Sequence, residues 1–121
     1  MRLVASMIVK DELKRYLPLV DDLDLAWAAG FLEGEGSFFR QSRGDIVVKA
    51  TQVDRESLDR LSKLFAGSVT YDSRVRDRGT RQPQWQWRLD GRRAVELMFI
   101  LFPLMTERRQ EQITKALEEV E

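Results

Sequence analysis

The stretch that decides the fold is Asp24–Phe39, with the sequence DLAWAAGFLEGEGSFF. Four of its residues recur at helical spacing and leave one face of the predicted helix almost without side chains: Ala26, Gly30, Glu33 and Gly34. Each glycine inside a helix costs about 1 kcal/mol relative to alanine. Two glycines one turn apart therefore predict that another backbone approaches this face closely.

The C-terminal end of this helix carries two carboxylates, Glu33 and Glu35, where the helix macrodipole is already negative. A divalent cation would offset that charge. Magnesium usually takes one or two protein carboxylates and completes its shell with water and phosphate. Pairing two such helices would bring two acidic ends together, so the pattern predicts a two-metal site for phosphodiester hydrolysis.

The nine residues Ala28–Gly36 resemble the motif of the LAGLIDADG homing endonucleases. Glutamate stands at both acidic positions of the motif, where the family usually has aspartate. The residues that agree with the motif are Gly30, Leu32 and Gly36, followed by Ser37 and Phe38. A single copy of the motif in a chain of 121 residues implies a homodimer, with the two motif helices packed around the two-fold axis.

The rest of the chain is consistent with this resemblance. Alternating patterns predict strands over residues 37–43, 46–53, 68–74 and 84–89, with a turn over residues 42–45 after the first. Apolar stripes predict helices from residue 54, over 94–101 and over 106–120. The fold class is therefore α+β, and the order matches the αββαββα unit of the family, with a four-stranded antiparallel DNA-binding saddle. We expect one domain over residues 23–121, preceded by an arm or short helix over residues 1–22.

The resemblance also implies which residues form the active site. Glu35 falls at the position of the metal ligand, and the backbone carbonyl of Gly34 would assist it. Gln52 falls where the family places a polar residue that orients water, although on its own Gln52 is equally consistent with an ordinary surface residue. Arg108 falls where a lysine is usual, and because arginine stays protonated and has a different geometry, cleavage could be slowed or lost. Glu33 is expected to support the helix ends and the dimer junction rather than to bind metal.

Two larger sets of residues follow from the resemblance. The partner's motif helix is expected to contact Ala26, Ala29, Gly30, Glu33 and Gly34. The outward faces of the strands are expected to read DNA bases, through Gln41, Arg43, Val47, Lys49, Thr51, Arg74, Gln84, Gln86 and Arg88. The loop between the last two strands is expected to hold phosphates through Arg76, Arg78 and Arg81. Charged side chains also keep the edges of sheets soluble, which is the alternative for any one of them.

Composition excludes several classes of site. The chain has no Cys and no His, which removes disulfides, thiolate and imidazole zinc sites, and catalytic triads. The net charge is zero, yet residues 38–93 contain 13 basic and 7 acidic residues, so the predicted sheet region is positive. No apolar run approaches the roughly 20 residues that span a bilayer, and no signal-peptide pattern is present. We expect an intracellular protein, in a cytoplasm, nucleoid or organelle, with no membrane partner and no small-molecule substrate.

These observations predict a homing endonuclease that makes double-strand breaks in a long, pseudo-palindromic DNA site as a homodimer. Its cofactor would be Mg²⁺, or another divalent cation such as Mn²⁺ or Ca²⁺, and its gene would belong to a mobile intron or intein. The alternative is a relative that binds DNA without cleaving it, or an RNA-splicing maturase. A third hypothesis, an unrelated α+β protein-interaction module, leaves the agreement of motif, element order and basic strands unexplained.

Overall fold

The computed structural model describes residues 16–72 and 84–118. Its elements follow in the order α2 (Asp22–Glu35), β1 (Gly36–Arg40), β2 (Ile46–Gln52), α3 (Glu56–Phe65), β3 (Ser68–Asp72), β4 (Gln84–Asp90), α4 (Arg92–Leu101), the 3-10 turn η2 (Phe102–Leu104) and α5 (Glu107–Leu117). This confirms the expected αββαββα order. Arg74, Arg76, Arg78 and Arg81 lie outside the described residues.

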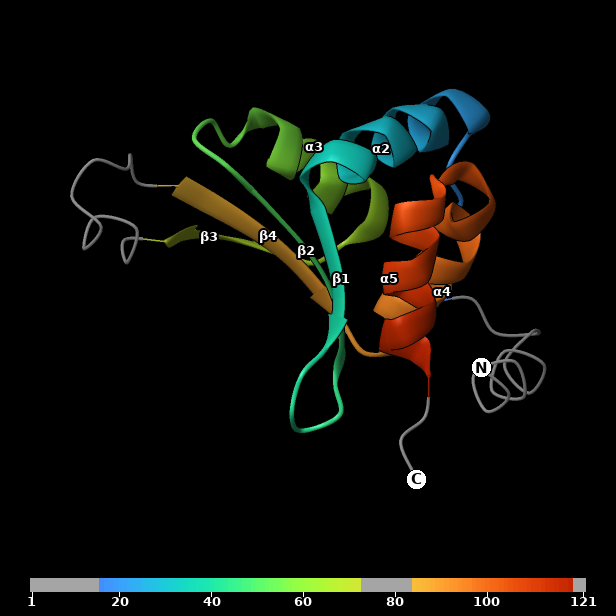
Figure 1. Cartoon of the computed structure of the whole chain (residues 1–121). Coiled ribbons are helices and arrows are strands. Elements are labelled where there is room, and N and C mark those ends of the chain that lie inside the picture. The colour runs from blue at the N-terminus through green and yellow to red at the C-terminus, as the bar shows by residue number, and fades with distance from the viewer. Residues whose placement is uncertain (1–15, 73–83, 119–121) are drawn as a thin grey trace.

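The four strands form one sheet in the order β1-β2-β4-β3, and every neighbouring pair is antiparallel. The helices gather on one side of this sheet and leave the other side uncovered (Figure 1). The predicted four-stranded antiparallel sheet is therefore confirmed. We call the side without helices the uncovered face.

Helix α2 has a defined start and an abrupt end. The side chain of Asp21 caps its first turn by accepting a hydrogen bond of 2.8 Å from the backbone N–H of Asp24. At the other end, a Cβ on Gly36 would lie only 2.7 Å from the carbonyl oxygen of Leu32. Glycine is therefore required where the chain passes directly from α2 into β1.

The hydrophobic core lies between the sheet and the helices. Alternate strand residues point into it, among them Phe38, Val48, Trp87 and Leu89, which are all buried. Trp87 is fully buried, and its indole N–H donates to the carbonyl of Ala66 at 2.9 Å, so its one polar group is satisfied. The helices contribute Leu32, Leu58, Leu61, Met98 and Ile113 to the same cluster.

The segment before α2 belongs to the same folded body. Residues 16–21 form no regular element. The backbone N–H groups of Tyr16 and Leu17 donate to the carboxylate of Glu96 on α4, at 2.8 and 3.2 Å, and the Leu17 side chain is buried in the core cluster. Each helix in the described part of the chain is too short or too polar to span a bilayer.

Several element boundaries differ from the expectation by one to three residues. Strand β1 ends at Arg40, not at residue 43, because Gly44 adopts a positive φ of 99° and closes a turn in which its N–H donates to the carbonyl of Gln41 at 2.8 Å. Helix α4 begins at Arg92, two residues before the predicted start. Gln41 and Arg43 therefore lie in a turn and not on a strand face.

Candidate functional site

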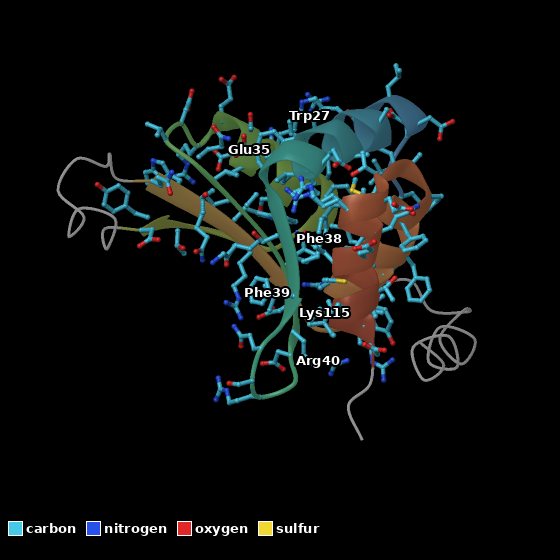
Figure 2. All side chains as sticks on the ribbon, in the orientation of Figure 1. Trp27, Glu35, Phe38, Phe39, Arg40 and Lys115 are labelled. Atoms are coloured by element: carbon cyan, nitrogen blue, oxygen red, sulfur yellow. The ribbon has the colours of Figure 1, made fainter. Side chains whose placement is uncertain are left out.

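Glu35 lies at the junction of α2 and β1. Both Glu35 and Gly34 are exposed, and the last turn of α2 contains no basic residue (Figure 2). The helix C-terminus and the carboxylates of Glu33 and Glu35 place negative charge at this end of α2, which Arg109 and Arg108 partly offset. The junction can therefore hold a cation, with the Glu35 carboxylate and a main-chain carbonyl as oxygen ligands.

Gln52 lies on the strand that passes this junction. Gly36, the first residue of β1, pairs with Ala50, so β2 continues for two residues beyond the start of β1, on the side of the last turn of α2. Gln52 pairs with Trp85 on its other side and is half-buried. The register thus brings Gln52 to the same end of the sheet as Glu35.

Glu33 is engaged within the chain. Its two carboxylate oxygens accept hydrogen bonds from the backbone N–H of Thr106 at 2.9 Å and from the Thr106 hydroxyl at 2.6 Å. These hydrogen bonds, the hydroxyl first, lower the pKa of Glu33, and the charges of Arg109 and Arg108 act in the same direction. Glu33 therefore caps the start of α5, whose own cap residue Thr106 makes no side-chain cap bond.

Arg109, on α5, makes a further contact with Glu33. It is buried, with 6% of its surface exposed, and its Nε donates to the backbone carbonyl of Glu33 at 2.8 Å. One terminal nitrogen donates to Gln112 at 2.7 Å, and the guanidinium lies 5.9 Å from the ring centre of Phe38. Burial lowers the pKa of Arg109, while Glu33 and Glu35 oppose that shift. Three hydrogen bonds thus join the motif helix to the start of α5, and in each of them Glu33 is the acceptor.

Of the two adjacent arginines, the sequence singled out Arg108, which is exposed. The structure instead directs Arg109 toward the acidic end of α2. A sequence signal for this exists, because Arg109 shares the buried stripe of α5 with Ile113, Ala116 and Leu117 at helical spacing. An arginine on an apolar stripe indicates a buried partner.

The uncovered face of the sheet is polar. Lys49 lies between Ser37 on β1 and Arg88 on β4, and Thr51 lies beside Gln86, which in turn pairs with Thr70 on β3. The ammonium of Lys49 lies 5.7 Å from the ring centre of Phe39, on the side of β1 away from Phe38 (Figure 2). Lys49, Thr51, Gln84, Gln86 and Arg88 all lie on this face, as expected. Ser37 and Thr70 join them and were missed in the sequence.

Two predicted contact residues are buried inside the chain. Val47 is on the uncovered face, but none of its surface is exposed, because the longer side chains of Phe39 and Asp90 lie on either side of it. Its expected contact with a thymine methyl is therefore wrong for this conformation. Ala29 is 6% exposed and packs in the core, so it offers almost no surface to a partner.

The other residues of the small-residue strip remain open. Ala26, Gly30 and Gly34 are exposed. A Cβ built on Gly30 or on Gly34 would meet no other atom within 4 Å. Neither glycine is therefore required by packing within the chain.

No family model and no curated protein matches the chain. Solved structures that share its fold include two homing endonucleases. The homing endonuclease I-TnaI is 21% identical, with a TM-score of 0.52, over 75% of this chain and 67% of its own. The group I intron-encoded homing endonuclease I-CeuI, solved in complex with DNA, is 14% identical, with a TM-score of 0.55, over 93% of this chain and 67% of its own. At such identities the likeness concerns the fold.

Proposed function

We propose that this chain, which has the fold of the LAGLIDADG homing endonucleases, is a divalent-metal-dependent endonuclease. It would cut both strands of a long, pseudo-palindromic DNA site as a homodimer. The observation that carries the proposal is the exposed carboxylate of Glu35 at the junction of α2 and β1, at the end of the open strip of small residues. Two such junctions, related by a two-fold axis, suit one cut in each strand.

A divalent ion fits the residues at the junction. The Glu35 carboxylate and the Gly34 carbonyl would hold it, and in the described residues no three Asp or Glu side chains gather into a closed cage. Mg²⁺ accepts such a site because it retains several waters and takes further oxygens from phosphate; Mn²⁺ or Ca²⁺ could occupy the same ligands. When bound, the ion would supply positive charge to the phosphate that is cleaved.

The side chains around the junction have distinct tasks in this proposal. Gln52 would orient the attacking water through its amide. Arg108 is exposed and would neutralise phosphate charge, whereas Arg109 holds the Glu33 carbonyl and so fixes the end of α2 on which Glu35 stands. A group that is held rigidly at the point where charge develops stabilises a transition state without reorganisation.

DNA would lie along the uncovered face. This face carries the basic side chains of Lys49 and Arg88, the amides of Gln84 and Gln86, and the carboxylate of Asp90. The stretch 38–93, which also contains α3, has 13 basic and 7 acidic residues. I-CeuI, which shares the fold, was solved in complex with DNA. The second protomer would pack on the strip formed by Ala26, Gly30 and Gly34, and so extend the uncovered face across two copies.

One observation favours a second candidate, a protein that binds nucleic acid without cutting it, or an RNA-splicing maturase. Both basic residues near the junction, Arg108 and Arg109, are arginines, and Arg109 is already hydrogen-bonded to Glu33 and Gln112. A guanidinium stays protonated and has a fixed fork geometry, so it cannot move a proton as an amine can.

The test is a cleavage selection with a randomised duplex library and Mg²⁺, followed by sequencing of the cut ends. We expect a two-fold-related site, and Glu35→Gln should lower its cleavage by at least about 100-fold, the scale of losing one charge-stabilising group, while binding survives. Glu111→Gln, which removes an exposed carboxylate from the side of α5, is the matched control and should cut normally. A library that is bound but never cut would favour the second candidate. Normal cleavage by Glu35→Gln would remove Glu35 from the metal site.

A further inference from the structure

We infer that Arg88 is a guanine-reading residue of the uncovered face, that Asp90 orients it, and that Gln41 covers its donors until DNA binds. This rests on the proposed function, because it assigns the base that the DNA-binding face recognises at one position. The residues come from two places in the chain, β4 and the turn that follows β1.

Arg88 lies near the middle of the sheet. It pairs with Lys49 on one side and with Ser68 on the other, and the buried Trp87 and Leu89 on either side of it in β4 turn its side chain to the uncovered face. Only 29% of the Arg88 side chain is exposed, so it is held down among its neighbours. A long side chain that is already ordered in the free protein loses less conformational entropy on binding.

Asp90 fixes one edge of the guanidinium. It lies two residues further along β4 on the same face, and its Oδ2 accepts from the Arg88 Nε at 3.3 Å. An exposed ion pair of this kind contributes little to stability. The ion pair instead orients the guanidinium. Because Nε donates to Asp90, the two terminal nitrogens remain as the donors that can face a ligand.

In the free protein, Gln41 is the acceptor for those two terminal nitrogens. With its amide oxygen turned toward Arg88, Gln41 accepts hydrogen bonds from both terminal nitrogens, one of them at 2.9 Å. An arginine reads guanine by the same geometry, with two donors directed at O6 and N7 in the major groove, and no other base offers two acceptors there. The Gln41 oxygen therefore occupies the place of a guanine edge.

Two expectations follow for binding. A guanine must displace the Gln41 amide before it can reach the guanidinium, so the apparent affinity for guanine is lowered by that exchange. Removing Gln41 should strengthen binding to the preferred site by about 2- to 10-fold, the scale of one net hydrogen bond. Removing Arg88 should weaken discrimination at a single half-site position by about 5- to 150-fold, the scale of one bidentate contact.

The experiment is a binding selection of the full chain on a randomised duplex library, repeated with Arg88→Ala, Arg88→Lys, Asp90→Asn and Gln41→Ala. In the unaltered protein we expect one two-fold-related pair of positions to be enriched in guanine. Arg88→Ala should lose that preference alone. Arg88→Lys should weaken the same preference by a smaller factor, because the lysine ammonium still donates to guanine but lacks the planar fork, and this change decides the matter if Arg88→Ala fails to fold. Asp90→Asn should relax the preference, and Gln41→Ala should retain or sharpen it.

Arg43→Ala is the matched control, because it removes the same charge from the turn that holds Gln41. It should lower binding to all sequences alike, as the loss of a phosphate contact does. If the Arg88 variants also lose affinity uniformly, or keep every base preference, Arg88 contacts phosphate or nothing and the inference is overturned. If the unaltered protein binds no DNA, the proposed function fails and this assignment fails with it. An unchanged preference in an otherwise DNA-binding protein overturns this assignment alone.

Discussion

Both faces of α2 carry small residues, but the small residues have different roles on the two faces. On one face Ala28 is fully buried, and it lets the helix lie close to the core into which Leu32 inserts. On the other face Gly30 and Gly34 are exposed, and a Cβ at either position would meet nothing within 4 Å. The buried face therefore determines the fold of the protomer. Packing within the chain does not require glycine at these two positions, which is why we propose that a second copy packs on the open face.

The largest effect that tests this contrast is expected from the buried face. Leu32→Ala should lower the free energy of unfolding by about 2–5 kcal/mol, because it removes most of a fully buried side chain and leaves a cavity in its place. Leu23→Ala is the matched control on the same helix, since Leu23 is 83% exposed, and it should change stability by less than about 0.5 kcal/mol. Urea denaturation of both variants gives the comparison. Similar losses at the two positions would contradict the division of α2 into two faces.

A smaller effect is expected at Glu33, on the edge between the faces. Its pKa lies below the ordinary value of 4.5 because of its hydrogen bonds to Thr106, so its charge stabilises the folded state above that pH. The contribution is lost as the pH falls through the lowered pKa. Glu33→Gln should therefore be less stable than the unaltered chain near pH 7, and the two should converge at strongly acidic pH.

Thermal unfolding midpoints between pH 7 and pH 3 measure this difference. Glu111→Gln, a change on an exposed part of α5, is the control for the loss of one carboxylate. A gap between Glu33→Gln and the unaltered chain that stays constant over the whole range would mean that the carboxylate charge is not what caps α5.

The sequence predicts the parts of the fold that repeat locally. The 3.6-residue period of Leu58, Leu61 and Phe65 in α3 and the alternation of Trp85, Trp87 and Leu89 in β4 are visible within a few residues, and both are observed. The order of elements along the chain and the presence of a four-stranded antiparallel sheet were predicted from the succession of such patterns and from the resemblance at Ala28–Gly36. The sequence also predicts the turn over residues 42–45, which is observed, but it did not show how early that turn ends the strand. The positive φ of Gly44 ended β1 at Arg40, and this moved Gln41 into the place where it meets Arg88.

Contacts between distant residues were outside the reach of sequence patterns. Arg109 and Glu33 are 76 positions apart. The apolar stripe of α5 indicates that Arg109 has a buried partner, but nothing near either residue identifies that partner as the Glu33 carbonyl. Val47 alternates correctly onto the uncovered face, but its burial depends on Phe39 and Asp90 from two other strands. A period shows which face a residue occupies. The neighbours that cover it follow only from register.

The smallest effect on the protomer is expected from Gly30→Leu. Leucine fits a helix better than glycine, and the position is open, so the free energy of unfolding of the protomer should stay the same or rise by up to about 1 kcal/mol. In the proposed dimer, however, a branched side chain would hold the two α2 backbones apart, and sedimentation velocity should show a monomer. Glu111→Leu adds the same side chain to an exposed position on α5 and should leave the dimer intact. A monomer with undiminished stability would establish that Gly30 is selected by the partner and not by the fold, whereas a persisting dimer would move the two-fold contact away from the open face of α2.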